Sequence, residues 1–228
     1  MKKEPNNQEQ SHDNHSKYNF QDNTTSKDLL AESAAQYLFA QPDGYTLKDY
    51  YALPDGHRAE LIDGELYDMV APGLAHQTAA ALLFQQLNEF IDAQGGSCLP
   101  FVSPVDVQLD CDDHTMVEPD VIVVCNLHKA IGRCIYGAPD LVMEILSPST
   151  AKRDQTIKLE KYRNAGVREY WMIDLKQKKV IVYDFEHKSL PIIYGMSEPI
   201  PVQIYHGQCK IRFDKILARI DLLRQYET

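Results

Sequence analysis

The sequence lacks several features that define whole classes of protein. No apolar run is long enough to cross a membrane as a helix, and the opening residues, MKKEPNNQEQ, contain no apolar stretch typical of a secretion signal. A Walker-type phosphate loop, a dinucleotide fingerprint and a Gly-x-Ser-x-Gly elbow are also absent. We therefore expect no membrane span and no secretion signal, and nothing here supports nucleotide-loop or serine-hydrolase chemistry.

Cysteine is scarce, and its spacing does not suggest a metal site. The chain has five cysteines, an odd number, and no two of them form a CxxC pair. This pattern predicts reduced thiols in a cytoplasmic protein, where they fill the core rather than bind metal. The five are Cys98, Cys111, Cys125, Cys134 and Cys209.

Basic residues are also in deficit. The 228 residues include 23 Lys and Arg against 33 Asp and Glu, which gives a formal net charge of -10. This balance argues against a protein that coats nucleic acid, because binding to phosphate needs an excess of positive charge. It leaves room for a local basic cleft around an acidic metal site.

The chain divides into a polar N-terminal part and one folded domain. Residues 1–27 are rich in Asn, Gln, Ser, Asp and His, so we expect a disordered tail that buries too little surface to fold. Residues 28–44 are expected to form a short helix or a linker. Residues 45–228 are enough for one sizeable core but too few to favour two domains.

Periodicity within the domain predicts a mixed α/β fold. Asp63-Gly64 lies between two alternating runs and suits a type I′ turn, so residues 59–69 predict a β-hairpin near the start of the domain. Apolar residues recur at helical spacing over 75–94 and over 214–225, and a shorter helix is expected over 156–164. Buried strands are expected within VEPDVIVVC (117–125) and DLVMEILS (140–147), a second hairpin over 169–175 and 179–185, and a last strand near 208–213. We therefore predict one mixed β-sheet with helices packed on it.

A charged residue interrupts the most apolar of these strands. Glu144 lies in LVMEILSPST, where burying an isolated carboxylate costs several kcal/mol or more unless it is protonated, paired or bound to a metal. Asp120 follows Pro119 at the mouth of the strand DVIVV. If the two strands are neighbours, the carboxylates converge and predict an Mg²⁺ site. The alternative is that Asp120 caps a turn and Glu144 pairs with a structural Arg or Lys.

The helix that follows this strand carries basic residues on one face. Lys158, Lys161, Tyr162 and Ala165 lie on the same side as Ile157, so the inward face must carry Lys158 or Tyr162 toward the strands. A lysine there would balance the carboxylates or stabilise an anionic transition state. The alternative is a solvated face on which Asp154 and Lys158 form a weak surface pair.

Two further polar residues are candidates for the same region. His76 precedes the apolar stripe of the long helix, and such a histidine is more often a core or capping residue than a ligand. Glu60 shares a strand face with Ile62, which predicts that it points inward, although most glutamates in hairpins are solvated.

Taken together, these stretches resemble a known family. The matching segments are AELIDGEL (59–66), AHQ (75–77), VEPDVIVV (117–124), APDLVMEILSPST (138–150) and RDQTIKLEKYRNAGVREYWMID (153–174). From about Tyr45 to beyond Asp174, the chain is similar to the Uma-two family of restriction-endonuclease-like proteins, within the PD-(D/E)xK superfamily.

The resemblance implies a restriction-endonuclease-like α/β core, frequent homodimers and a set of site residues. Asp120, Glu144 and the backbone carbonyl of Ile145 would hold Mg²⁺ or Mn²⁺, which would activate a water and clamp the scissile phosphate. The superfamily lysine normally follows the acidic residue by two positions, where this chain has Leu146. The family pattern assigns that role to Lys158, with Lys161 as the second choice. Glu60, His76 and Tyr162 match further family positions.

The leading hypothesis is thus a cytoplasmic, homodimeric, Mg²⁺-dependent endonuclease that hydrolyses double-stranded DNA to 5′-phosphate and 3′-hydroxyl ends. One alternative is a non-catalytic binding or regulatory protein on a nuclease fold, which the acidic balance and Leu146 favour. A second is a carboxylate-lysine enzyme that acts on another phosphate or on a small molecule.

Overall fold

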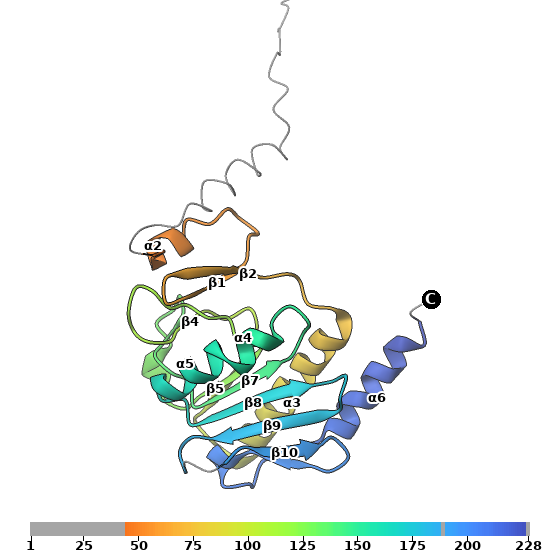
Figure 1. Cartoon of the computed structure of the whole chain (residues 1–228). Helices are drawn as coiled ribbons and strands as arrows, with labels where there is room; N and C mark the ends of the chain where they lie inside the picture. The colour runs from red at the N-terminus through yellow and green to blue at the C-terminus, as the bar shows by residue number, and fades with distance from the viewer. Residues whose placement is uncertain (1–43, 188–189, 227–228) are drawn as a thin grey trace, which may run out of the picture. The chain divides into compact units, whose positions relative to one another are not determined.

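The computed structural model describes residues 44–187 and 190–226 (Figure 1). The predicted tail at 1–27, and the helix or linker expected at 28–44 apart from its last residue, lie outside the described residues. Within the described ranges the fold is the predicted mixed α/β architecture: one central sheet with helices on both faces.

The central sheet has six strands in the order β10-β9-β8-β7-β5-β3. Only β7 and β8 pair in parallel, and the other neighbouring strands are antiparallel. The strands are β3 (Leu99–Val102), β5 (Val121–Val124), β7 (Leu141–Ile145), β8 (Glu169–Asp174), β9 (Lys179–Asp184) and β10 (Ile192–Gly195). Every residue of β7 is buried, as its apolar composition predicts.

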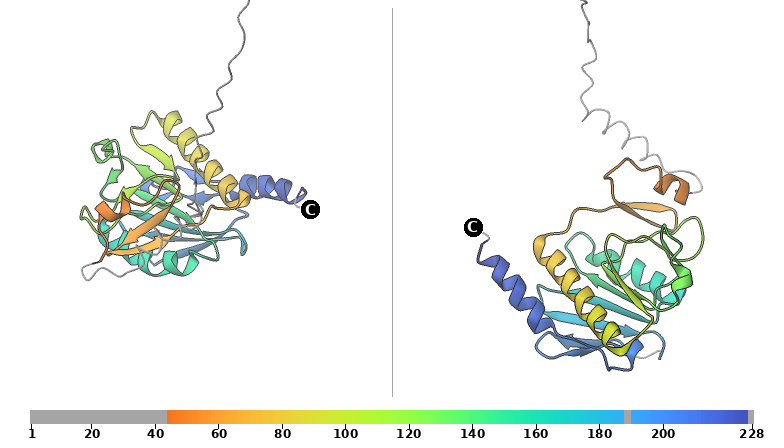
Figure 2. Two further views of the ribbon diagram at one scale, coloured as in Figure 1. Left: turned by 90° about the horizontal axis from the view of Figure 1, so that it is seen from above. Right: turned by 180° about the vertical axis from the view of Figure 1, so that it is seen from behind.

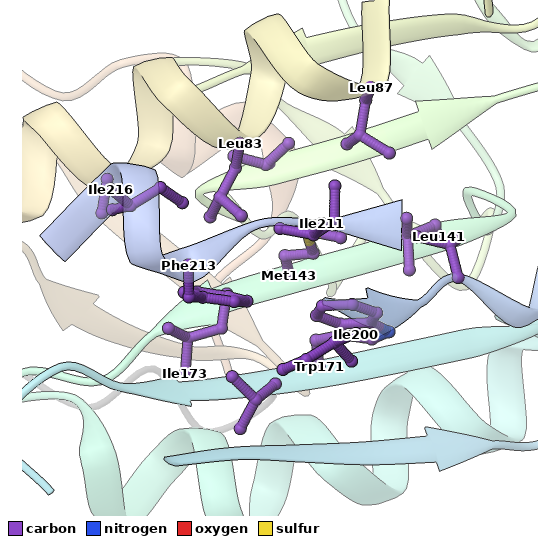
Figure 3. Packing of buried hydrophobic residues seen from close by; sticks show 14 of the residues in the cluster. Leu83, Leu87, Leu141, Met143, Trp171, Ile173, Ile200, Ile211, Phe213 and Ile216 are labelled. Atoms are coloured by element: carbon purple, nitrogen blue, oxygen red, sulfur yellow. The ribbon is translucent and has the colours of Figure 1, made fainter. Parts of the chain in front are cut away.

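Alternation along the strands divides the interior into two layers. Helices α3 (Leu74–Gln94) and α6 (Phe213–Arg224) cover one face (Figure 2), where Val121, Met143 and Trp171 point. Figure 3 shows side chains from these helices packed against the sheet. The labelled residues there are Leu83, Leu87, Leu141, Met143, Trp171, Ile173, Ile200, Ile211, Phe213 and Ile216.

The opposite face of the sheet carries helices α4 (Ala151–Gln155) and α5 (Ile157–Ala165) (Figure 1). Ile122, Val142 and Tyr170 point to this side, where they pack with Tyr162 and Val167 of the α5 region. The helix predicted over 156–164 is α5, whereas the separate helix α4 directly before it was not predicted. The break falls at Thr156, whose φ of -126° and ψ of -86° are not helical.

The predicted hairpin is β1 (Ala59–Ile62) paired with β2 (Glu65–Asp68). Asp63 and Gly64 both have positive φ, 51° and 81°, as a type I′ turn requires. Upstream lies α2 (Leu47–Tyr50), where the Asp49 carboxylate accepts hydrogen bonds from the backbone and hydroxyl of Thr46.

Shorter elements complete the described chain. β4 (Val107–Gln108) pairs in parallel with β6 (Ile135–Tyr136), and β11 (Ile200–Pro201) pairs with β12 (Lys210–Ile211). Two single turns of 3₁₀-helix are η1 (Leu127–Lys129) and η2 (Gln203–Tyr205). No helix in the described ranges has the length and apolar character needed to cross a membrane.

The cysteines differ from the expectation of reduced thiols. Cys98 and Cys125 form a disulfide, while Cys111, Cys134 and Cys209 are free. The physical reason is strand register: Leu99 of β3 lies opposite Val124 of β5, so the cysteines one residue beyond each come face to face. The sequence could not show this, because 27 residues separate the two cysteines.

The layer between α3 and the sheet should dominate stability. Leu87 is fully buried there, so Leu87→Ala should lower the free energy of unfolding by about 3 kcal/mol through lost contacts and a residual cavity. Leu222→Ala, at a residue that is 43% exposed on α6, is the matched control and should change it by less than about 1 kcal/mol. Urea unfolding measures both, and equal losses would contradict this packing.

Candidate functional site

Asp120 and Glu144 come from neighbouring strands, which is the condition that the predicted convergence of their carboxylates required. Asp120 directly precedes β5, and Glu144 is the fourth residue of β7. These strands are antiparallel with Val121 opposite Met143, so the next step of the register sets Asp120 opposite Glu144. Both carboxylates share the alternation of Val142, which faces α4 and α5.

Glu144 is held by two donors from α5. Its Oε1 accepts a hydrogen bond from the Tyr162 hydroxyl at 2.7 Å and lies 2.5 Å from Lys158 Nζ. Burial raises the pKa of Glu144 to about 8, against the lowering effect of Lys158 and with further raising by nearby carboxylates. Both contacts use the same oxygen, so Oε2 takes no part in them.

Asp120 is fixed by the backbone of the neighbouring strand and by a histidine. Its Oδ2 accepts a hydrogen bond from the Ile145 amide at 2.7 Å and lies 3.1 Å from Nε2 of His76, in the first turn of α3. Burial lowers the pKa of His76, but the hydrogen bond and charge of Asp120 outweigh it, and the net pKa is raised. Both contacts involve Oδ2, and neither involves Asp120 Oδ1.

Lys158 lies at the centre of the buried charges. Its Nζ is 2.7 Å from Glu60 Oε1, 2.5 Å from Glu144 Oε1 and 3.7 Å from Asp154 Oδ1, and the residue is only 3% exposed. Burial alone would lower the pKa of Lys158. The surrounding carboxylates raise it well above its ordinary value, so the lysine is a cation.

The inward orientations predicted for Glu60, Lys158 and Tyr162 are confirmed. Each is buried, with exposures of 1%, 3% and 0% respectively, so the solvated alternatives do not hold for them. Lys161 points elsewhere: its Nζ is 2.6 Å from Asp63 Oδ1 and also contacts Asp110. That places Lys161 with the hairpin turn rather than with Glu144.

Two residues from α4 were missed as site residues. Asp154 is 2% exposed, with a pKa raised chiefly by burial, although the sequence suggested only a surface partner for Lys158. Arg153 Nε lies 3.3 Å from Glu60 Oε2. The i,i+4 spacing of Asp154 and Lys158 is the one feature of the sequence that pairs them. The burial of Asp154 could not be inferred without knowing how α4 packs on the sheet.

The charges of this cluster leave room for a cation. The contacts and electrostatic effects just described join four carboxylates, those of Glu60, Asp120, Glu144 and Asp154, to two permanent cations, Lys158 and Arg153. The negative excess has to be relieved, either by protons on Glu144 and His76 or by a bound cation. Within the described ranges, no group of three or more His, Cys, Asp or Glu side chains is arranged to hold a metal.

Removing the central lysine should destabilise the fold. Lys158→Met leaves Glu60 and Glu144 without their shared cation, so the free energy of unfolding at neutral pH should fall by about 3 kcal/mol. The loss should shrink at acid pH, where protonation neutralises the carboxylates. Urea unfolding at both pH values tests this.

Lys161→Met is the control for that substitution. Its partners Asp63 and Asp110 are 64% and 24% exposed at the side chain and so are partly solvated, and the loss should be about 1 kcal/mol or less. Equal losses for the two variants, or a Lys158→Met loss that does not depend on pH, would contradict the buried ion network.

Comparison with known proteins agrees with the fold. The structure is similar to a crystal structure titled as a "putative nuclease belonging to DUF820 from Anabaena variabilis ATCC 29413", with 20% sequence identity and a TM-score of 0.63. The match covers 77% of this chain and 98% of that one. None of the curated proteins matches. Residues 47–204, most of the chain, match the model of a family described as "Putative restriction endonuclease", and the chain therefore belongs to the Uma2 family.

Proposed function

We propose that this protein is a Mg²⁺- or Mn²⁺-dependent endonuclease that hydrolyses phosphodiester bonds of double-stranded DNA. One observation carries the proposal: Asp120 and Glu144 converge from neighbouring strands, and a buried lysine lies against Glu144. Membership of a nuclease family supports the general reaction class.

Asp120 and Glu144 are the residues that would hold the metal. Among residues 44–187 and 190–226, the contacts of each carboxylate use a single oxygen, and hard divalent cations prefer carboxylate oxygens together with waters. The Ile145 carbonyl is a further candidate ligand at the same strand end. A bound Mg²⁺ or Mn²⁺ would supply a water of lowered pKa and offset charge on the scissile phosphate.

The surrounding residues hold these carboxylates in place. The Ile145 amide and His76 fix Asp120 Oδ2, and the Tyr162 hydroxyl fixes Glu144 Oε1. The Lys158 ammonium, fixed beside Glu144, would offset the negative charge that develops at the phosphate. Leu146, which occupies the usual lysine position, packs against the apolar layer under α5 instead.

Specific observations also support one alternative function, that of a non-catalytic protein. A net charge of -10 and the pairing of Lys158 within the chain also suit a non-catalytic binding or regulatory protein on the same fold. The cytoplasmic location and the homodimer stay predictions drawn from the sequence. The Cys98–Cys125 disulfide weighs against the first of these, because disulfides are uncommon in that compartment.

Cleavage of supercoiled plasmid tests the proposal. The wild-type protein should nick the plasmid with Mg²⁺ or Mn²⁺ and stop when EDTA is added. Glu144→Gln removes a metal-binding charge and should slow nicking by roughly a hundredfold or more, as is typical when one electrostatic group is lost from an active site. Glu160→Gln, an exposed carboxylate on α5 paired with Arg163, is the matched control and should cut normally.

Two results would contradict the nuclease. Equal nicking by wild type and Glu144→Gln would mean that this site is not responsible. Absence of nicking, together with no heat of Mn²⁺ binding by calorimetry at millimolar metal, would favour the non-catalytic alternative.

A further inference from the structure

Glu60 differs from the other carboxylates of the site in the donors that surround it. Its Oε1 accepts hydrogen bonds from Lys158 Nζ at 2.7 Å and from the Glu118 amide at 3.1 Å, and its Oε2 lies 3.3 Å from Arg153 Nε. Both oxygens therefore face cations or N–H groups. A carboxylate with both oxygens engaged in this way is poorly placed to bind a metal.

Asp154 belongs to the same side of the cluster. Its Oδ1 lies 3.7 Å from Lys158 Nζ, and the side chain of Thr150 lowers its pKa by hydrogen bonding, although burial raises it more. The Asp154 carbonyl accepts a hydrogen bond from the Tyr170 hydroxyl of β8 at 3.1 Å, which ties α4 to the sheet. Asp154 is thus a buried carboxyl group in a fixed place beside Lys158.

The charged residues separate into two groups. Glu60 and Asp154, when ionised, carry two negative charges, and their contacts are with Lys158 and Arg153, which carry two positive ones. Asp120 and Glu144, once both are ionised, add two more negative charges, which a divalent cation would match. The first group is neutral by itself, so it can persist when the second binds a metal.

A metal at Asp120 and Glu144 would repel the Lys158 ammonium, which lies 2.5 Å from Glu144. Lys158 lies on helix α5 rather than on β7, so the backbone of the strand that carries Glu144 does not fix its position. Glu60 on β1 and Asp154 on α4 are then the anions that keep it near the metal.

We propose that Glu60 and Asp154 are positioning residues that hold the Lys158 ammonium beside Glu144, and that they act through this lysine rather than on metal or DNA. The catalytic part of this inference rests on the proposed function. The electrostatic part does not, because it concerns the metal-free protein.

The first experiment is a double-mutant cycle on urea unfolding of the metal-free protein. Lys158→Met should destabilise the Glu60→Gln background by less than half as much as it destabilises wild type, because the interaction is already weakened. Asp154→Asn should also reduce the destabilisation caused by Lys158→Met, but by a smaller amount than Glu60→Gln does. Glu118→Gln is the control: Glu118 is buried nearby but pairs with Arg58, so its effect should add to that of Lys158→Met. Full additivity of Glu60→Gln with Lys158→Met would overturn the proposal.

The second experiment needs only folded single variants and Mn²⁺. By calorimetry, Glu60→Gln should keep the wild-type number of Mn²⁺ sites and weaken affinity by less than about a hundredfold, as expected for a residue outside the ligand set. Loss of a site, or a fall of roughly a hundredfold or more, would make Glu60 a ligand and overturn the proposal.

Cleavage rates supply the last comparison. Glu60→Gln should lower kcat by about tenfold to a hundredfold with little change in KM, and should cause no further loss in the Lys158→Met background. An additional loss there would mean that Glu60 acts independently of the lysine. If wild type neither cuts nor binds Mn²⁺, the proposed function fails, while the unfolding cycle still decides whether Glu60 and Asp154 hold Lys158.

Discussion

The arrangement of the site depends on one buried ion pair, Lys158 with Glu144. Neither group is tolerable alone in a layer of apolar side chains, since an uncompensated buried charge costs several kcal/mol. Their contact ties α5 to β7, and it brings Glu60 of the hairpin and Asp154 of α4 into the same network. The pair thus links the assembly of the fold to the electrostatics of the site.

The order of the strands places a second carboxylate, Asp120, beside Glu144 and so forms a candidate metal centre. Because β5 lies beside β7 in antiparallel register, Asp120 is set opposite Glu144 and faces the same helices. His76 reaches Asp120 from α3, on the other side of the sheet's end, so the strand ends are held from both layers. The repulsion between the carboxylates is relieved either by a proton on Glu144 or by a bound cation, which makes metal binding and protonation of Glu144 competing outcomes.

Sequence alone predicted the local elements and much of the site. Asp63-Gly64 gave the hairpin, and the apolar strand containing Glu144 pointed to a carboxylate that needs a partner. Asp154 and Arg153 were missed because their burial depends on how α4 docks, which no periodicity encodes. The prediction of reduced thiols was wrong for Cys98 and Cys125, because their opposition follows from pairing of β3 with β5 and not from spacing along the chain. Both features depend on contacts between segments far apart in the sequence, which local patterns do not encode.

A metal site at Asp120 and Glu144 is best tested by a crystal structure of the protein soaked in Mn²⁺, with an anomalous difference map. An anomalous peak is expected within about 2–2.6 Å of a carboxylate oxygen of both Asp120 and Glu144, with Lys158 still in contact with Glu60. No peak at that position under millimolar Mn²⁺, or a peak bound by Glu60 in place of Lys158, would contradict it.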